Sequence, residues 1–162
     1  MHVRMEDVIN PGARFDARSA VIGGLIVGAL MWLLSHGMPW FASGMVSPTL
    51  LGRYLKPGGL VDTGRSLVTA VAEVGVSVVY TLILALVVTR LRGLWAIALG
   101  GVVGVALYFL NYALFRATAS TDWTGSELPV LVTHIAFGMI AAGTYKGLAA
   151  RRIVPDRRLE QT

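Results

Sequence analysis

The chain contains no cysteine, which excludes disulfide bonds, thiolate metal ligands and thiol chemistry. Charged residues make up only 14% of its 162 residues, whereas soluble domains carry about 25%. The sequence also lacks a glycine-rich phosphate loop between a strand and a helix, because its Gly-Gly pairs at 23–24 and 100–101 lie inside apolar stretches. No nucleophile, base and orienting group occur together. We therefore expect no enzymatic activity.

Apolar residues are what the sequence has in excess, at 55% of the chain. Residues 93–115 contain no charge at all, and a helix needs about 20 apolar residues to cross a hydrocarbon core of about 30 Å. Lipid offers no partner to exposed backbone groups, so apolar runs of this length must be helical. The predicted spans are residues 20–40, 66–89, 94–115 and 128–145. The sequence predicts an all-α integral membrane four-helix bundle in one domain, 1–162.

The connecting segments differ in positive charge. Ten of the lysines and arginines fall in the leader at 1–18, the hairpin near residue 91 and the tail at 146–162, and four fall in the loops at 41–65 and 116–127. The positive-inside rule then places both termini in the cytoplasm and the two loops outside. The net charge of +5 matches a basic rim beside anionic lipid headgroups, so no nucleic-acid partner is expected.

The longer outer loop, at 41–65, has a helix-start pattern of its own. Ser47 is followed by Pro48, a capping residue and a proline at the first helical position, and leucines then recur at helical spacing. A turn at 57–59 ends this stretch. We expect a short amphipathic helix on the outer face between the first two spans.

Small residues recur four positions apart on three of the spans. Such spacing lets helix backbones approach closely in lipid, where no hydrophobic force drives association between helices. The residues expected to pack helices are Gly24, Gly28, Gly100, Gly104, Gly138 and Ala142. Four short helices bury little surface alone, so these stripes also favour packing on a second copy or on a larger membrane complex.

Polar residues recur at one predicted depth, in the outer half of the membrane. They are His36, Glu73, Asn111, Tyr112 and His134. A carboxylate at the depth of Glu73 costs roughly 2.5–3.5 kcal/mol, so it must be protonated, paired or facing water. The alternatives are that His36 faces water at its helix end, that Asn111 hydrogen-bonds two helices together, and that His134 packs at the interface.

Histidines on different helices at one depth can ligate a metal or a haem. His36 and His134 are the ligands that this alternative requires, with Glu73 as a third ligand or an orienting group. No His-Glu-x-x-His or haem-attachment motif accompanies them. The expectation is therefore no metal and no cofactor, with haem kept as an alternative.

The layout resembles the YagU-like family of uncharacterised bacterial inner-membrane proteins. The resemblance rests on GGLIVGA at 23–29, a loop with Trp40 and prolines after the first span, the tight hairpin before the Leu-Trp pair at 94–95, and THIAFG at 133–138 before basic residues. It implies location in the bacterial inner membrane and no particular activity.

Three functions remain open from the sequence. The first is a non-enzymatic accessory or assembly subunit that acts through helix packing, either as a homo-oligomer or within a larger complex. The second is a small proton-linked transporter or channel in which Glu73 titrates and the histidines relay the proton. The third is a haem- or metal-binding redox subunit that uses His36 and His134.

Overall fold

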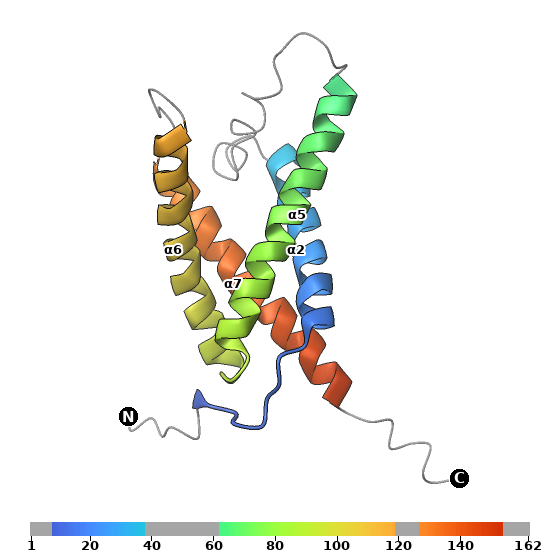
Figure 1. The fold of residues 1–162 in the computed structure, drawn as a ribbon, viewed down its shortest axis with the longest axis vertical. Coiled ribbons are helices and arrows are strands. Elements are labelled where there is room, and N and C mark those ends of the chain that lie inside the picture. The colour runs from blue at the N-terminus through green and yellow to red at the C-terminus, as the bar shows by residue number, and fades with distance from the viewer. Residues whose placement is uncertain (1–7, 38–61, 119–126, 154–162) are drawn as a thin grey trace, which may run out of the picture.

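Four α-helices make up most of the structure, a computed structural model that describes residues 8–37, 62–118 and 127–153 (Figure 1). They are α2 (Ala17–Gly37), α5 (Asp62–Val88), α6 (Gly93–Thr118) and α7 (Glu127–Ile153). All four are long and apolar enough to cross a membrane, and the described residues form no strand beyond one isolated bridge. For the described residues, the all-α class and the presence of four helices long and apolar enough to span a membrane are confirmed. The predicted amphipathic helix at 47–55 lies outside the described residues.

The helix ends follow from local capping. Asp16 precedes α2, and its Oδ1 accepts hydrogen bonds from the backbone N–H groups of Arg18 (3.1 Å) and Ser19 (3.3 Å). The Ser19 hydroxyl donates to Oδ2 of the same carboxylate at 2.6 Å. The Asp16 side chain thus satisfies two of the free backbone donors in the first turn of α2. α5 ends in a tight turn over residues 89–92, and the Arg92 carbonyl accepts from the Ala96 N–H at 2.9 Å as α6 begins.

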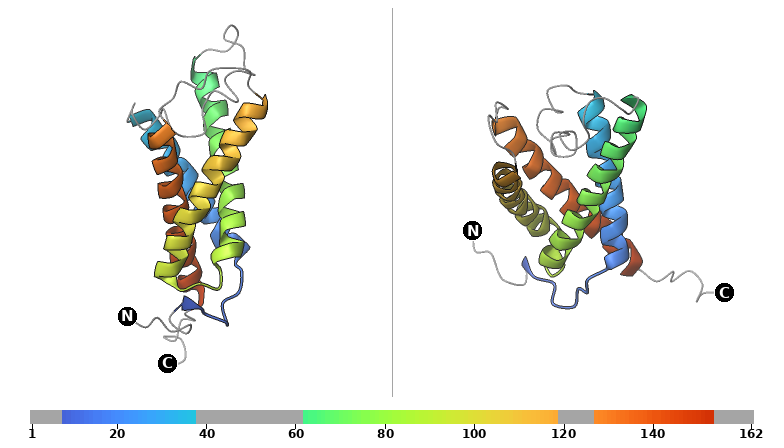
Figure 2. Two further views of the ribbon diagram at one scale, coloured as in Figure 1. Left: turned by 90° about the vertical axis from the view of Figure 1, so that its left-hand side faces the viewer. Right: turned by 45° about the horizontal axis from the view of Figure 1, so that its top comes forward.

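The helices pack as two pairs joined by the last helix. α2 packs most extensively on α5, and α6 packs most extensively on α7. Although α5 and α6 are neighbours in sequence, they diverge from their shared turn (Figure 1) and contact each other little. α7 runs obliquely across the bundle, as the right-hand view of Figure 2 shows, and it also packs against α2 and α5. The fold is therefore held together through α7.

The interior and the outer surface are both apolar. Buried side chains from all four helices form the core, and the largest fully buried ones include Val27, Met31, Leu84, Val88 and Tyr145. Large apolar side chains are also exposed all around, for example Leu94 at 77%, Leu128 at 69% and Phe109 at 60%. An apolar surface this extensive is unsuited to water, and it is typical of helices whose outer faces contact lipid.

One end of the bundle gathers several chain segments. Residues 8–16, the α5–α6 turn and the C-terminal end of α7 all lie at the lower end in Figure 1. The backbone of the first segment pairs with the turn, with Ile9 bridged to Leu91. This arrangement is what an even number of spans requires.

Candidate functional site

A hydrogen-bonded polar network joins three helices inside the bundle. The Tyr80 hydroxyl, from α5, donates to Asn111 Oδ1 of α6 at 2.7 Å. Asn111 Nδ2 lies 2.9 Å from His134 Nε2 of α7, and His134 Nδ1 lies 2.8 Å from the Val130 carbonyl oxygen. We name Tyr80, Asn111 and His134 the three-helix network.

The hydrogen-bond partners in this network determine which atoms of His134 carry a hydrogen. A carbonyl oxygen only accepts, so His134 Nδ1 carries a hydrogen. Asn111 Nδ2 only donates, so His134 Nε2 accepts and the imidazole is neutral. The Tyr80 hydroxyl donates to Oδ1 of the same amide. Every one of these polar atoms is thus paired within the chain.

Aromatic rings enclose the network. The Tyr108 ring meets the His134 ring edge to face, with centroids 5.8 Å apart. Tyr112 stacks on Tyr108 at 6.3 Å, and Phe137 packs against the Tyr80 ring at 6.4 Å. His134 is 5% exposed and Tyr108 is 8% exposed. The rings exclude competing hydrogen-bond partners and so favour the protein's own hydrogen bonds.

The predicted polar residues fall into three groups. Asn111 and His134 are directly hydrogen-bonded, and Tyr112 lies one ring away, stacked on Tyr108. Glu73 is half-buried in the spanning part of α5, about two turns from Tyr80. His36 belongs to the last turn of α2, but its side chain is not among those that the structure describes. The network thus contains a member, Tyr80, that the predicted cluster omitted.

Small residues lie where helix backbones touch in the α2–α5 pair. A Cβ on Gly24 would lie 2.6 Å from Val78 Cα, and a Cβ on Gly28 would lie 2.9 Å from Val74 Cα. Backbone atoms cannot yield as a flexible side chain does, so both positions require glycine. Glu73 adjoins Val74 and therefore lies at the level of the Gly28 contact.

The α6–α7 pair is packed more closely still. A Cβ on Gly138 would collide with the Gly100 carbonyl oxygen, and one on Gly104 would collide with the His134 carbonyl oxygen. A Cβ on Gly100 would also lie 2.8 Å from the Ala142 Cβ. The small-residue stripes are thus used in contacts between helices of a single chain. By themselves they do not indicate contact with a second copy or a partner.

A second polar cluster, which the sequence analysis missed, lies nearer the end that carries residues 8–16. Tyr145 of α7 is 1% exposed, and its hydroxyl lies 2.9 Å from Thr89 Oγ1 and accepts from the Asp16 N–H at 3.3 Å. Lys146 Nζ donates to the Thr89 carbonyl at 2.8 Å, beyond the last residue of α5. A cation at a helix C-terminus is electrostatically favourable. This cluster ties α7 to α5 and to the start of α2.

The described residues offer no ready metal site. No group of three or more histidine, aspartate or glutamate side chains lies close enough to hold a metal within the described part of the chain. Both ring nitrogens of His134 are already hydrogen-bonded, so ligation by His134 would cost one of those bonds. One of the two ligands that the haem alternative requires, His134, is therefore already hydrogen-bonded to other groups.

Comparison of the chain with protein-family models, with curated proteins and with solved structures gave no match. The likeness to the YagU-like family therefore stays a prediction.

Proposed function

We propose that the protein is a non-enzymatic, multi-pass subunit of the bacterial inner membrane that serves the assembly or stability of a membrane complex. The observation that supports this is the three-helix network, in which the side chains of Tyr80, Asn111 and His134 are all used to hold α5, α6 and α7 together. Polar groups of this kind specify how helices pack in lipid. They are not presented to a substrate.

The proposed orientation has both termini in the cytoplasm. The described end with residues 8–16 carries exposed Arg14, Arg18, Arg90, Arg92 and Arg151. In most inner-membrane proteins, the loops rich in lysine and arginine lie on the cytoplasmic side. A partner would then meet the protein on its apolar outer faces, since the glycine stripes are already used between its own helices.

The proposal is tested by purifying the tagged full-length chain in mild detergent from its native membrane. We expect a colourless protein that retains another membrane protein at a fixed stoichiometry, measured by native mass spectrometry. An unrelated multi-pass protein with the same tag is the control for adventitious capture. Recovery of the chain with lipid alone would overturn the proposal, and a Soret band would favour the haem alternative instead.

The transport alternative has less support from the geometry. Within the three-helix network, a proton relay from Tyr80 to His134 would have to pass Asn111. A side-chain amide both donates and accepts, but it does not exchange protons as an imidazole or a hydroxyl does. Transport therefore rests on Glu73 alone, as a half-buried carboxyl group within a span.

A further inference from the structure

The segment at residues 8–16 is held against the α5–α6 turn by its backbone. The Asn10 N–H donates to the Arg90 carbonyl at 2.7 Å, and the Arg92 N–H donates to the Val8 carbonyl at 2.9 Å. At its other end the segment runs into the Asp16 cap of α2. Two anchors therefore fix residues between them across the end of the bundle.

This anchoring brings arginines from distant parts of the sequence to one edge. Arg14 comes from the anchored segment, and Arg90 and Arg92 come from the turn that the segment pairs with. We call these three residues the arginine edge. All three side chains are exposed. The one described carboxylate at this end, Asp16, already accepts from Ser19.

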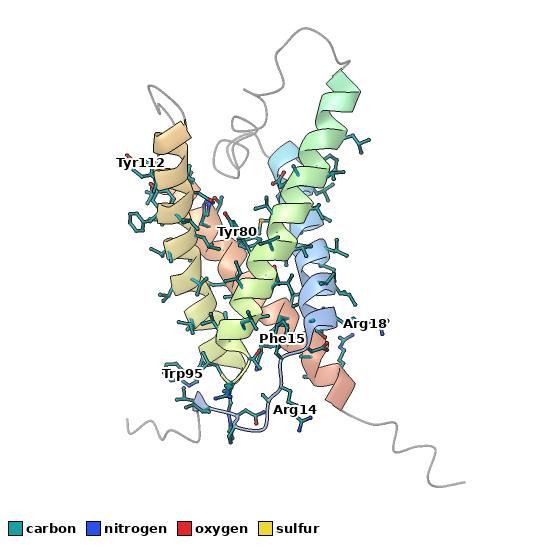
Figure 3. The ribbon with its side chains drawn as sticks, in the orientation of Figure 1. Arg14, Phe15, Arg18, Tyr80, Trp95 and Tyr112 are labelled. Atoms are coloured by element: carbon teal, nitrogen blue, oxygen red, sulfur yellow. The ribbon has the colours of Figure 1, made fainter. Side chains whose placement is uncertain are left out.

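Exposed aromatic side chains accompany the arginine edge. Phe15 follows Arg14, and Trp95 lies in the first turn of α6. Each of these two side chains is 40% exposed. Figure 3 shows Arg14, Phe15 and Trp95 at the same end of the bundle, where the spanning helices begin and end. Aromatic rings of this kind settle at the depth of lipid headgroups. The arginines are thus placed at the boundary between hydrocarbon and water.

We propose that the arginine edge is a binding site for the phosphate of anionic phospholipid headgroups in the leaflet at this end. A guanidinium group offers a planar fork of donors that matches phosphate oxygens two at a time. Three exposed guanidinium groups, gathered beside aromatic rings at one end of the bundle, can bind phosphodiester oxygens together. The site would hold lipid at the joint between residues 8–16 and the α5–α6 turn.

The test uses the delipidated full-length protein in detergent, with phosphatidylglycerol or phosphatidylcholine of identical acyl chains added and retention measured by native mass spectrometry. The wild type is expected to retain phosphatidylglycerol preferentially. Arg14→Gln should weaken this retention about fivefold, and the triple variant R14Q/R90Q/R92Q should weaken it on the order of a hundredfold. Circular dichroism checks that each variant keeps its helical content.

Arg151→Gln is the matched control. Arg151 is also exposed and lies near the C-terminal end of α7, at the same end of the bundle, so the variant loses the same charge away from the turn. We expect its phosphatidylglycerol retention to equal that of the wild type. The proposal is overturned if the wild type shows no preference for the anionic lipid, or if Arg151→Gln weakens retention as much as Arg14→Gln does.

Discussion

Replacing Gly138 with alanine is expected to force α6 away from α7 and to destabilise the protein by about 3 kcal/mol or more. The added methyl group would collide with the Gly100 carbonyl oxygen and lie 3.1 Å from the Gly104 backbone nitrogen. Both obstacles are backbone atoms of a helix, so no side-chain rotation relieves the collision. The free energy of unfolding is measured by titration with a denaturing detergent and followed by circular dichroism.

Gly147 provides the control on the same helix. Among the described residues no atom lies within 4 Å of a Cβ built at this position. Alanine is favoured over glycine in a helix interior by about 1 kcal/mol, so Gly147→Ala should leave stability unchanged or raise it slightly. Equal losses for Gly138→Ala and Gly147→Ala would show that the α6–α7 contact is not as close as described.

Replacing Tyr145 with alanine is expected to cost about 3–5 kcal/mol. Its side chain is the largest of those that are fully buried, and its hydroxyl bonds to both Thr89 and the Asp16 N–H. Removal would leave a cavity between α7, α5 and the start of α2, together with a polar group that has lost its partner. The same detergent titration measures the loss.

Tyr145→Phe separates the two contributions. Phenylalanine keeps the ring and removes only the hydroxyl, so we expect a loss of about 1–2 kcal/mol. Thr89 would still donate to the Ala85 carbonyl, which limits the penalty. Wild-type stability in Tyr145→Phe would show that the ring alone matters and that the hydroxyl does not join the helices.

The spans were predictable because length and hydropathy suffice to identify a membrane helix. Counting depth from the span ends also placed Asn111 and His134 at one level, and the structure shows them hydrogen-bonded. The pairing of helices was not predictable in this way. A tight turn suggests that α5 and α6 are partners, yet α6 packs mainly on α7, because glycines on both helices allow a closer approach there.

Tyrosines were the residues whose roles the sequence did not reveal. In a membrane helix a tyrosine serves equally well as a headgroup anchor, a packing ring or a hydrogen-bond donor. Tyr80 and Tyr145 are distinguished from headgroup anchors by the hydrogen-bond partners of their hydroxyl groups, and those partners come from distant parts of the sequence. The contact between residues 8–16 and the α5–α6 turn is made by backbone groups, which no side-chain pattern encodes.

A double-mutant cycle between Tyr80→Phe and Asn111→Leu tests most directly whether the three-helix network holds the helices together. The free energies of unfolding of the two single variants and of the double variant are compared with that of the wild type. We predict a coupling of about 1 kcal/mol, within the range measured for hydrogen bonds between membrane helices. Additive effects, with a coupling below about 0.3 kcal/mol, would contradict the structural role of the network.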